Sequence, residues 1–243
     1  MSWLWWQKLK QKLGMGVLQA AVELDQKTQQ RLTDATPVVP SEQLLSSAPT
    51  MIFDLETTGL NTRTDTVLSI GAVKLQPNKG IELGNSFYQV LDIAVDLAGE
   101  SQLIHGLTQK DLAAGCAPRQ ALLDFLTYSK GHIWLAFHAE FDRRMIKNAA
   151  LQHLGLIVDP QPIDIAYMAP LLFPELSKPQ IGLDYWLNVF ELPTLGRHNA
   201  TADALATAEL LMILLHKAQE MGYETWGELG QACLQQRQLQ RLL

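Results

Sequence analysis

The sequence has few cysteines, no excess of positive charge and no long apolar run. Its two cysteines, Cys116 and Cys233, lie far apart and form no CxxC or Cys/His metal spacing, so we expect both to be packing residues. The formal net charge of -6 argues against a protein that coats duplex phosphates with a dense basic surface, so any nucleic-acid contact should be small and local. The richest apolar window, residues 205–215, is too short for a membrane span and contains Glu209. Without a convincing signal peptide or transmembrane segment, a cytoplasmic protein is expected.

The composition is that of a folded globular chain. Hydrophobic residues make up 47% and charged residues 18% of the 243 residues, which is far from the composition of a disordered protein. The length allows one domain of about 200 residues with extensions. We expect three parts: an N-terminal helical arm with its linker over residues 1–47, a main domain over residues 48–220, and a C-terminal helix over residues 221–243.

Apolar runs and turn residues predict the elements of the main domain. Strands are expected over residues 50–55, 67–75, 86–91 and 133–137. Helices are expected over residues 108–115, 118–131, 140–154, 181–190, 201–219 and from residue 225. Three strands in succession indicate an antiparallel start, and the whole order predicts an α/β domain with a mixed sheet covered by helices.

The first 47 residues differ in character from the rest of the chain. The pattern of residues 1–33 predicts a helix interrupted by two glycines. The segment that follows, up to residue 49, is rich in proline and serine and is expected to be a linker. The apolar side chains Trp3, Trp5 and Trp6 suit docking on the main domain or binding of another protein, such as a polymerase. Attachment to a membrane surface through these residues and the nearby lysines is the alternative.

Two carboxylates share one predicted strand. Asp54 and Glu56 are two residues apart, so their side chains leave the same face, whereas Phe53 and Leu55 point to the other face. A pair of carboxylates in an apolar strand must be solvated, paired or metal-bound, because burying an unpaired charge is costly. A metal site is therefore one interpretation, and a solvated strand end is the other.

Two further acidic residues are expected in the first turns of helices. Asp142 follows the predicted strand 133–137, and Asp203 opens the predicted helix 201–219. The helix dipole favours a negative charge at either position and is sufficient to explain each of them. His198 lies in a loop just before Asp203, where a solvated histidine is the simplest interpretation.

Taken together, these segments resemble the DEDDh family of 3′-5′ exonucleases, which includes the proofreading epsilon subunit of bacterial DNA polymerase III and related stand-alone exonucleases. The three motifs of that family are matched by FDLETTGL at residues 53–60, FHAEFD at 137–142 and HNATADA at 198–204. The resemblance extends from about residue 51 to residue 215 and includes LIHGLT at 103–108. It implies a ribonuclease H-like fold, that is, a mixed sheet flanked by helices.

The resemblance also implies a set of catalytic residues and a cofactor. The catalytic set is Asp54, Glu56, Asp142, His198 and Asp203. By the resemblance, two divalent cations are held by the four carboxylates, with Asp54 bridging both ions, Glu56 and Asp203 completing one site and Asp142 supporting the other. Oxygen ligands favour Mg²⁺ or Mn²⁺. His198 is implied as the general base, a role that suits imidazole near neutral pH.

Substrate contacts are expected at six positions, namely Thr57, Thr58, Leu60, His105, Thr108 and Phe141. The first five are implied by the resemblance, whereas Phe141 is a candidate for stacking on a base. The segment around Thr57 resembles the part of the family that holds the terminal nucleotide, and His105 and Thr108 would lie near its base or sugar. For His105 the alternative is a polar loop residue that caps a helix, and for Phe141 it is a core residue. Thr108 also has a capping-box pattern with Asp111.

The implied activity is hydrolysis at the 3′ end of single-stranded or frayed duplex DNA, with release of nucleoside 5′-monophosphates. One alternative is an RNA-directed exoribonuclease of the oligoribonuclease or RNase T type, because the same five residues serve both substrates and discrimination rests on contacts to the 2′-OH. The other is a non-catalytic accessory subunit of a polymerase or repair complex. The motifs do not choose between DNA and RNA, and they predict no oligomeric state.

Overall fold

The computed structural model describes residues 42–95, 106–178, 181–193, 196 and 198–240. The helix expected over residues 1–33 and His105 therefore lie outside the described residues. None of the helices in the described ranges is both long enough and apolar enough to cross a membrane.

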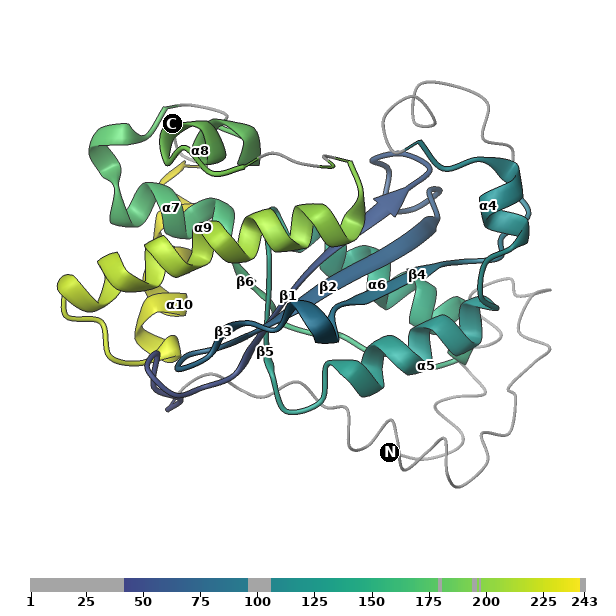
Figure 1. The fold of residues 1–243 in the computed structure, drawn as a ribbon, viewed down its shortest axis with the longest axis horizontal. Coiled ribbons are helices and arrows are strands. Elements are labelled where there is room, and N and C mark those ends of the chain that lie inside the picture. The colour runs from purple at the N-terminus through teal and green to yellow at the C-terminus, as the bar shows by residue number, and fades with distance from the viewer. Residues whose placement is uncertain (1–41, 96–105, 179–180, 194–195, 197, 241–243) are drawn as a thin grey trace.

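A six-stranded mixed sheet forms the centre of the molecule (Figure 1). Its strands are β1 (Thr50–Thr57), β2 (Val67–Gln76), β3 (Gly80–Ile81), β4 (Phe87–Val90), β5 (Ile133–Ala136) and β6 (Ile163–Asp164). They lie in the order β3-β2-β1-β5-β6, and β4 also pairs with β2. The pairing of β2 with β1, β3 and β4 is antiparallel, whereas β5 pairs in parallel with β1 and β6. The predicted mixed sheet with an antiparallel start is thus confirmed.

Seven α-helices and two short 3₁₀ helices are present in the described residues. They are α4 (Gln109–Ala113), α5 (Pro118–Tyr128), α6 (Ala139–Leu154), α7 (Ile165–Leu172), α8 (Leu183–Val189), α9 (Ala200–Glu220), α10 (Trp226–Gln240), η1 (Leu83–Asn85) and η2 (Pro174–Leu176). The sequence predicted all of the α-helices except α7. That helix has only eight residues and contains Pro170, which ordinarily ends a helix. Strands β3 and β6 were also missed, because two residues show no periodicity.

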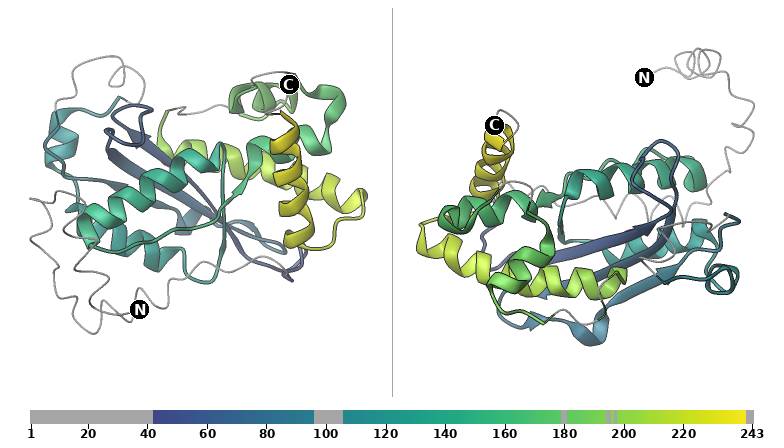
Figure 2. Two further views of the ribbon diagram at one scale, coloured as in Figure 1. Left: turned by 180° about the vertical axis from the view of Figure 1, so that it is seen from behind. Right: turned by 90° about the horizontal axis from the view of Figure 1, so that it is seen from above.

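Alternate residues of β1 belong to different apolar layers. Ile52 packs in a cluster built largely from α7, α8, α9 and α10, whereas Met51 and Phe53 pack in a second cluster with α5 and α6. Figure 2 shows α9 and α6 on opposite sides of the sheet. The predicted alternation is therefore confirmed, and Asp54, which follows Phe53, lies on the face of the sheet that α9 covers.

The C-terminal helix belongs to the same core as the sheet. Trp226, at the start of α10, is fully buried, and its backbone N–H donates to the Gln43 carbonyl at 2.8 Å. Leu44 forms an antiparallel bridge with Thr225, and Leu45 is buried in the cluster around α9. The chain just before β1 is thus tied to the beginning of α10.

Candidate functional site

Strand β1 supplies two carboxylates to the face covered by α9. Asp54 pairs with Gly71 of β2, and Glu56 pairs with Ser69. The register shifts after Glu56, at Thr57, where β1 ends. Both carboxyl-bearing residues are partly exposed, so this end of the strand reaches solvent.

Helix α9 supplies the third carboxylate from its first turn. Asn199 caps the helix, because its side-chain oxygen accepts the N–H groups of Thr201 and Ala202 at 3.1 and 3.2 Å. Asp203 is only 7% exposed, and its carboxylate accepts the backbone N–H of His198 at 3.1 Å. The position expected for Asp203, in the opening turn of a helix, is confirmed.

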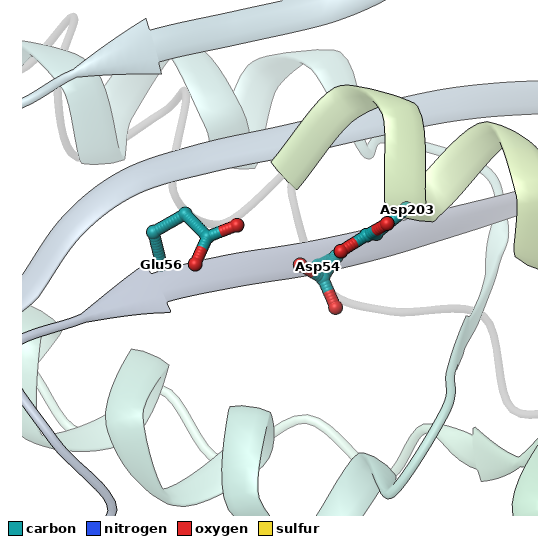
Figure 3. A group of neighbouring side chains, drawn as sticks. All are labelled: Asp54, Glu56 and Asp203. Atoms are coloured by element: carbon teal, nitrogen blue, oxygen red, sulfur yellow. The ribbon is translucent and has the colours of Figure 1, made fainter. Parts of the chain in front are cut away.

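Asp54, Glu56 and Asp203 form a compact acidic cluster (Figure 3). One carboxylate oxygen from each residue lies within 4.8 Å of the other two. At that separation, two negative charges repel by about 3.5 kcal/mol per pair if the effective dielectric constant is about 20. Three converging carboxylate oxygens are the donors that hard divalent cations prefer, so this cluster fits such an ion.

Asp142 is placed in the first turn of α6, as predicted, but it is not part of the acidic cluster found among the described residues. It is only 4% exposed. Burial raises the pKa of its carboxyl well above the usual range, and the negative charges of Asp164 and Glu56 add to the effect. Asp142 is thus near enough to Glu56 for the two carboxyl groups to interact electrostatically.

Asp164 is a partly buried acidic residue near Asp142 that was not predicted from the sequence. Its carboxylate oxygen accepts the backbone N–H of His138 at 3.0 Å and that of Ala166 at 3.1 Å. It therefore caps α7 and also holds the residue that precedes α6. Burial raises the pKa of Asp164. An Asp directly before an apolar run is an N-cap signal, which would have indicated this helix start.

Two histidines adopt left-handed backbone conformations next to the acidic helix starts. His138 has a φ of 63° and precedes α6, and His198 has a φ of 65° and lies just before Asn199, the N-cap of α9. Residues other than glycine rarely occupy this region, and such conformations cluster at functional sites. The side chain of His198 is exposed, in the loop position expected for it.

The segment after β1 forms a closed loop. The Thr57 hydroxyl donates to the Gly59 carbonyl at 2.8 Å. The Thr58 hydroxyl donates to Asp65 at 3.0 Å and accepts the N–H of Thr66 at 3.0 Å. Both hydroxyls thus hold the loop together, whereas Leu60 is 86% exposed and accessible to a ligand.

The remaining proposed substrate contacts have local structural roles in the described residues. Thr108 is the N-cap of α4 and forms the predicted capping box with Asp111. Phe141 is partly buried and packs against the apolar cluster of α5 and α6, in agreement with the alternative of core packing. The structure thus brings three of the predicted carboxylates together and places His198 beside them.

Comparison with known proteins identifies related sequences. Residues 51–211 match the protein family described as Exonuclease. The DNA polymerase III PolC-type of Caldanaerobacter subterraneus subsp. tengcongensis is 29% identical over 203 residues, which cover 83% of this chain and 14% of that protein. The protein of the same name from Listeria welshimeri is 30% identical over 194 residues, which cover 78% of this chain and 13% of that protein. The chain thus spans only a small part of the length of these relatives.

Solved structures share the architecture. Cell-death related nuclease 4 aligns with a TM-score of 0.59 and 15% identity, covering 74% of this chain and 66% of that one. E. coli Exonuclease I in complex with a dT13 oligonucleotide aligns with a TM-score of 0.57 and 17% identity, covering 72% and 42%. Exonuclease X in complex with 5′ overhanging duplex DNA aligns with a TM-score of 0.57 and 19% identity, covering 75% and 98%. The predicted ribonuclease H-like mixed α/β fold is therefore confirmed.

The family match covers more than half of the chain and includes all three acidic motifs, at residues 53–60, 137–142 and 198–204. The same region contains the acidic cluster. This chain therefore belongs to the Exonuclease family.

Proposed function

We propose that this protein is a metal-dependent 3′-5′ exonuclease that acts on single-stranded or frayed duplex DNA and releases nucleoside 5′-monophosphates. The observation that carries the proposal is the convergence of Asp54, Glu56 and Asp203 within 4.8 Å in a chain of the Exonuclease family. DNA is favoured over RNA because the sequence relatives are named as DNA polymerases and two of the structural neighbours are complexes with DNA.

The proposed cofactor is a pair of Mg²⁺ or Mn²⁺ ions. Asp54, Glu56 and Asp203 would hold them, with Asp142 contributing from the side of Glu56. Bound divalent cations keep neighbouring carboxylates ionised and stabilise the negative charge that develops on a phosphodiester during hydrolysis. Burial and the charge of Glu56 raise the pKa of Asp142, and a bound cation would oppose this effect by stabilising its ionised carboxylate.

His198 is proposed as the general base. Its exposed imidazole can reach a water molecule, and its backbone N–H is anchored to Asp203 at 3.1 Å. A ring nitrogen would take the proton of the attacking water, which is the task that imidazole performs near neutral pH. The bond to Asp203 ties the position of this base to the acidic cluster.

The terminal nucleotide is proposed to contact the loop that follows β1. Leu60 presents an exposed apolar side chain there, while Thr57 and Thr58 keep the loop closed. Contacts from His105 and Thr108 remain predictions of the resemblance, and stacking of Phe141 on a base remains a prediction from its aromatic side chain. The Thr108 side chain caps α4, so Thr108 would have to contact the substrate while it keeps this capping hydrogen bond.

A digestion assay tests the proposal. Single-stranded, duplex and mismatched DNA and an RNA of the same sequence, each labelled at the 5′ end, are incubated with Mg²⁺ or Mn²⁺. We expect a ladder that shortens by single nucleotides from the 3′ end of the single-stranded and mismatched DNA. EDTA and Asp54→Asn should abolish it. Faster digestion of RNA would favour the exoribonuclease alternative, and intact substrates with either metal would refute the activity.

We also propose an arm and linker over residues 1–47, an exonuclease domain over 48–220 and a C-terminal helix over 221–243 that packs in the core of that domain. The arm is proposed to bind another protein, and the polymerase relatives make a polymerase the first candidate. Because Leu45 is buried against the core, the binding segment should lie before it. Deletion of residues 1–41 should therefore leave digestion intact and abolish co-purification with a polymerase. Unchanged co-purification would argue against the arm as the binding segment.

A further inference from the structure

Gly71 occupies a special place in the sheet. It pairs with Asp54 of β1 on one side and with Tyr88 of β4 on the other. Directly paired residues of neighbouring strands present their side chains to the same face of a sheet. A side chain at position 71 would therefore project beside Asp54 on the face that α9 covers.

The first turn of α9 occupies the space that this side chain would need. A Cβ atom on Gly71 would lie 2.2 Å from the carbonyl carbon of Ala200 and 2.2 Å from the backbone nitrogen of Thr201. Real Cβ atoms essentially never approach other heavy atoms this closely. Because both neighbours are backbone atoms, no change of side-chain rotamer can relieve the clash.

A hydrogen bond ties the same turn to the sheet. The Thr201 hydroxyl donates to the Phe87 carbonyl of β4 at 3.1 Å. Asp203 lies only two residues further along this turn, with its carboxylate in the acidic cluster. The height of the turn above the sheet therefore determines how far Asp203 lies from Asp54.

We propose that Gly71 is a positioning residue whose missing side chain lets the backbone of α9 rest directly on β2 and so sets the separation of Asp203 from Asp54. The inference deepens the proposed function, on which it rests for the identity of the cluster as a metal site. A methyl group at position 71 would have to move the turn by at least about 1.2 Å, because the 2.2 Å separations must grow to the 3.4 Å of ordinary contact. Displacements of about 1 Å in an active site can lower rates by about 100-fold.

The test uses the full chain with Gly71→Ala and the matched control Gly84→Ala. Nothing lies within 4 Å of a Cβ at position 84, so that change adds the same methyl group without a clash. Mn²⁺ affinity is measured from the electron paramagnetic resonance of the free ion, folding from circular dichroism and thermal melting in EDTA, and kcat and KM from digestion of a labelled oligonucleotide. Gly71→Ala should weaken Mn²⁺ binding by about tenfold or more and lower kcat by about 100-fold, with KM changed less. The control should match the wild type.

A folded Gly71→Ala protein with wild-type Mn²⁺ affinity and kcat would overturn the inference. If Gly71→Ala does not fold, Thr201→Val tests the inference instead, because it removes only the hydrogen bond that ties the same turn to Phe87. It should weaken Mn²⁺ binding by about threefold or more, because the turn that carries Asp203 is then held less firmly against the sheet. An unchanged affinity would overturn the inference, and so would a wild-type chain that binds no Mn²⁺.

The proposed exonuclease activity and the proposed role of Gly71 can be refuted independently. A wild-type chain that binds Mn²⁺ but digests no DNA would refute the activity. The Mn²⁺ affinities of the variants would still test the role of Gly71.

Discussion

Replacing Asp54 by asparagine should change the stability of the protein in opposite directions with and without metal. Asp54 is one of three carboxylates within 4.8 Å of one another, so in the absence of a cation its charge is repelled by two neighbours. Asparagine has nearly the same shape and removes that charge. In EDTA we therefore expect Asp54→Asn to be more stable than the wild type, although it is inactive.

The expected magnitude follows from the geometry of the cluster. Two pairs at about 3.5 kcal/mol each give about 7 kcal/mol at an effective dielectric constant of about 20. Asp54 and Glu56 are partly exposed, so salt and water reduce this value, and we expect a gain of about 1–2 kcal/mol. For a protein of this size the gain corresponds to a rise of about 2–8 °C in Tm. In contrast, Mn²⁺ at about 100 times its Kd should stabilise the wild type by about 2.7 kcal/mol.

Thermal melting of both proteins in EDTA and in Mn²⁺ measures the effect. Asp92→Asn is the matched control, because Asp92 is exposed and lies outside the acidic cluster, and its Tm should respond to Mn²⁺ as that of the wild type does. Asp54→Asn should melt above the wild type in EDTA and gain little from Mn²⁺. A variant that melts below the wild type in EDTA and gains as much from Mn²⁺ would refute the argument from repulsion.

Three further outcomes are expected. His198→Ala should lower kcat by about 100-fold or more while leaving Mn²⁺ affinity unchanged, and a wild-type kcat would exclude it as general base. Asp164→Ala should cost about 0.5–1.5 kcal/mol of stability, because it removes the acceptor of the His138 and Ala166 N–H groups, and it should lower kcat by loosening the start of α6. Urea unfolding and digestion measure both effects, and Asp164→Asn, which keeps an acceptor oxygen, should lose less. Burial lowers the pKa of His132 below 6.5, so the unfolded chain binds a proton there more readily than the folded protein. Stability should therefore fall as the pH drops below about 6.5. His132→Gln should reduce the difference between the free energies of unfolding that urea titration gives at pH 7.5 and pH 5.5. An equal difference in both proteins would contradict this assignment.

The local features of the site could be predicted from the sequence. The alternation of Asp54 and Glu56 with buried residues follows from the period of a strand, and it is confirmed by the separate packing of Ile52 and Phe53. The helix starts at α6 and α9 were likewise predicted from local patterns. These features depend on neighbours within a few residues, so they can be recognised without the fold.

Asp164 shows why other residues of the site were not predicted from the sequence. It lies in a two-residue strand before a helix that contains Pro170, so neither element has a strong periodic signal. Its contact with His138 joins residues 26 positions apart. No local pattern reports such a contact.

The sequence alone determined which residues carry the acidic groups and that two of them share one face of a strand, because side-chain direction in a strand is a local property. Only the tertiary structure decided that Asp203 joins those two while Asp142 is buried outside their cluster. In our proposal, the position of Asp203 depends on how closely the backbone of α9 approaches β2 at Gly71, which is a contact between segments more than 100 residues apart in the chain.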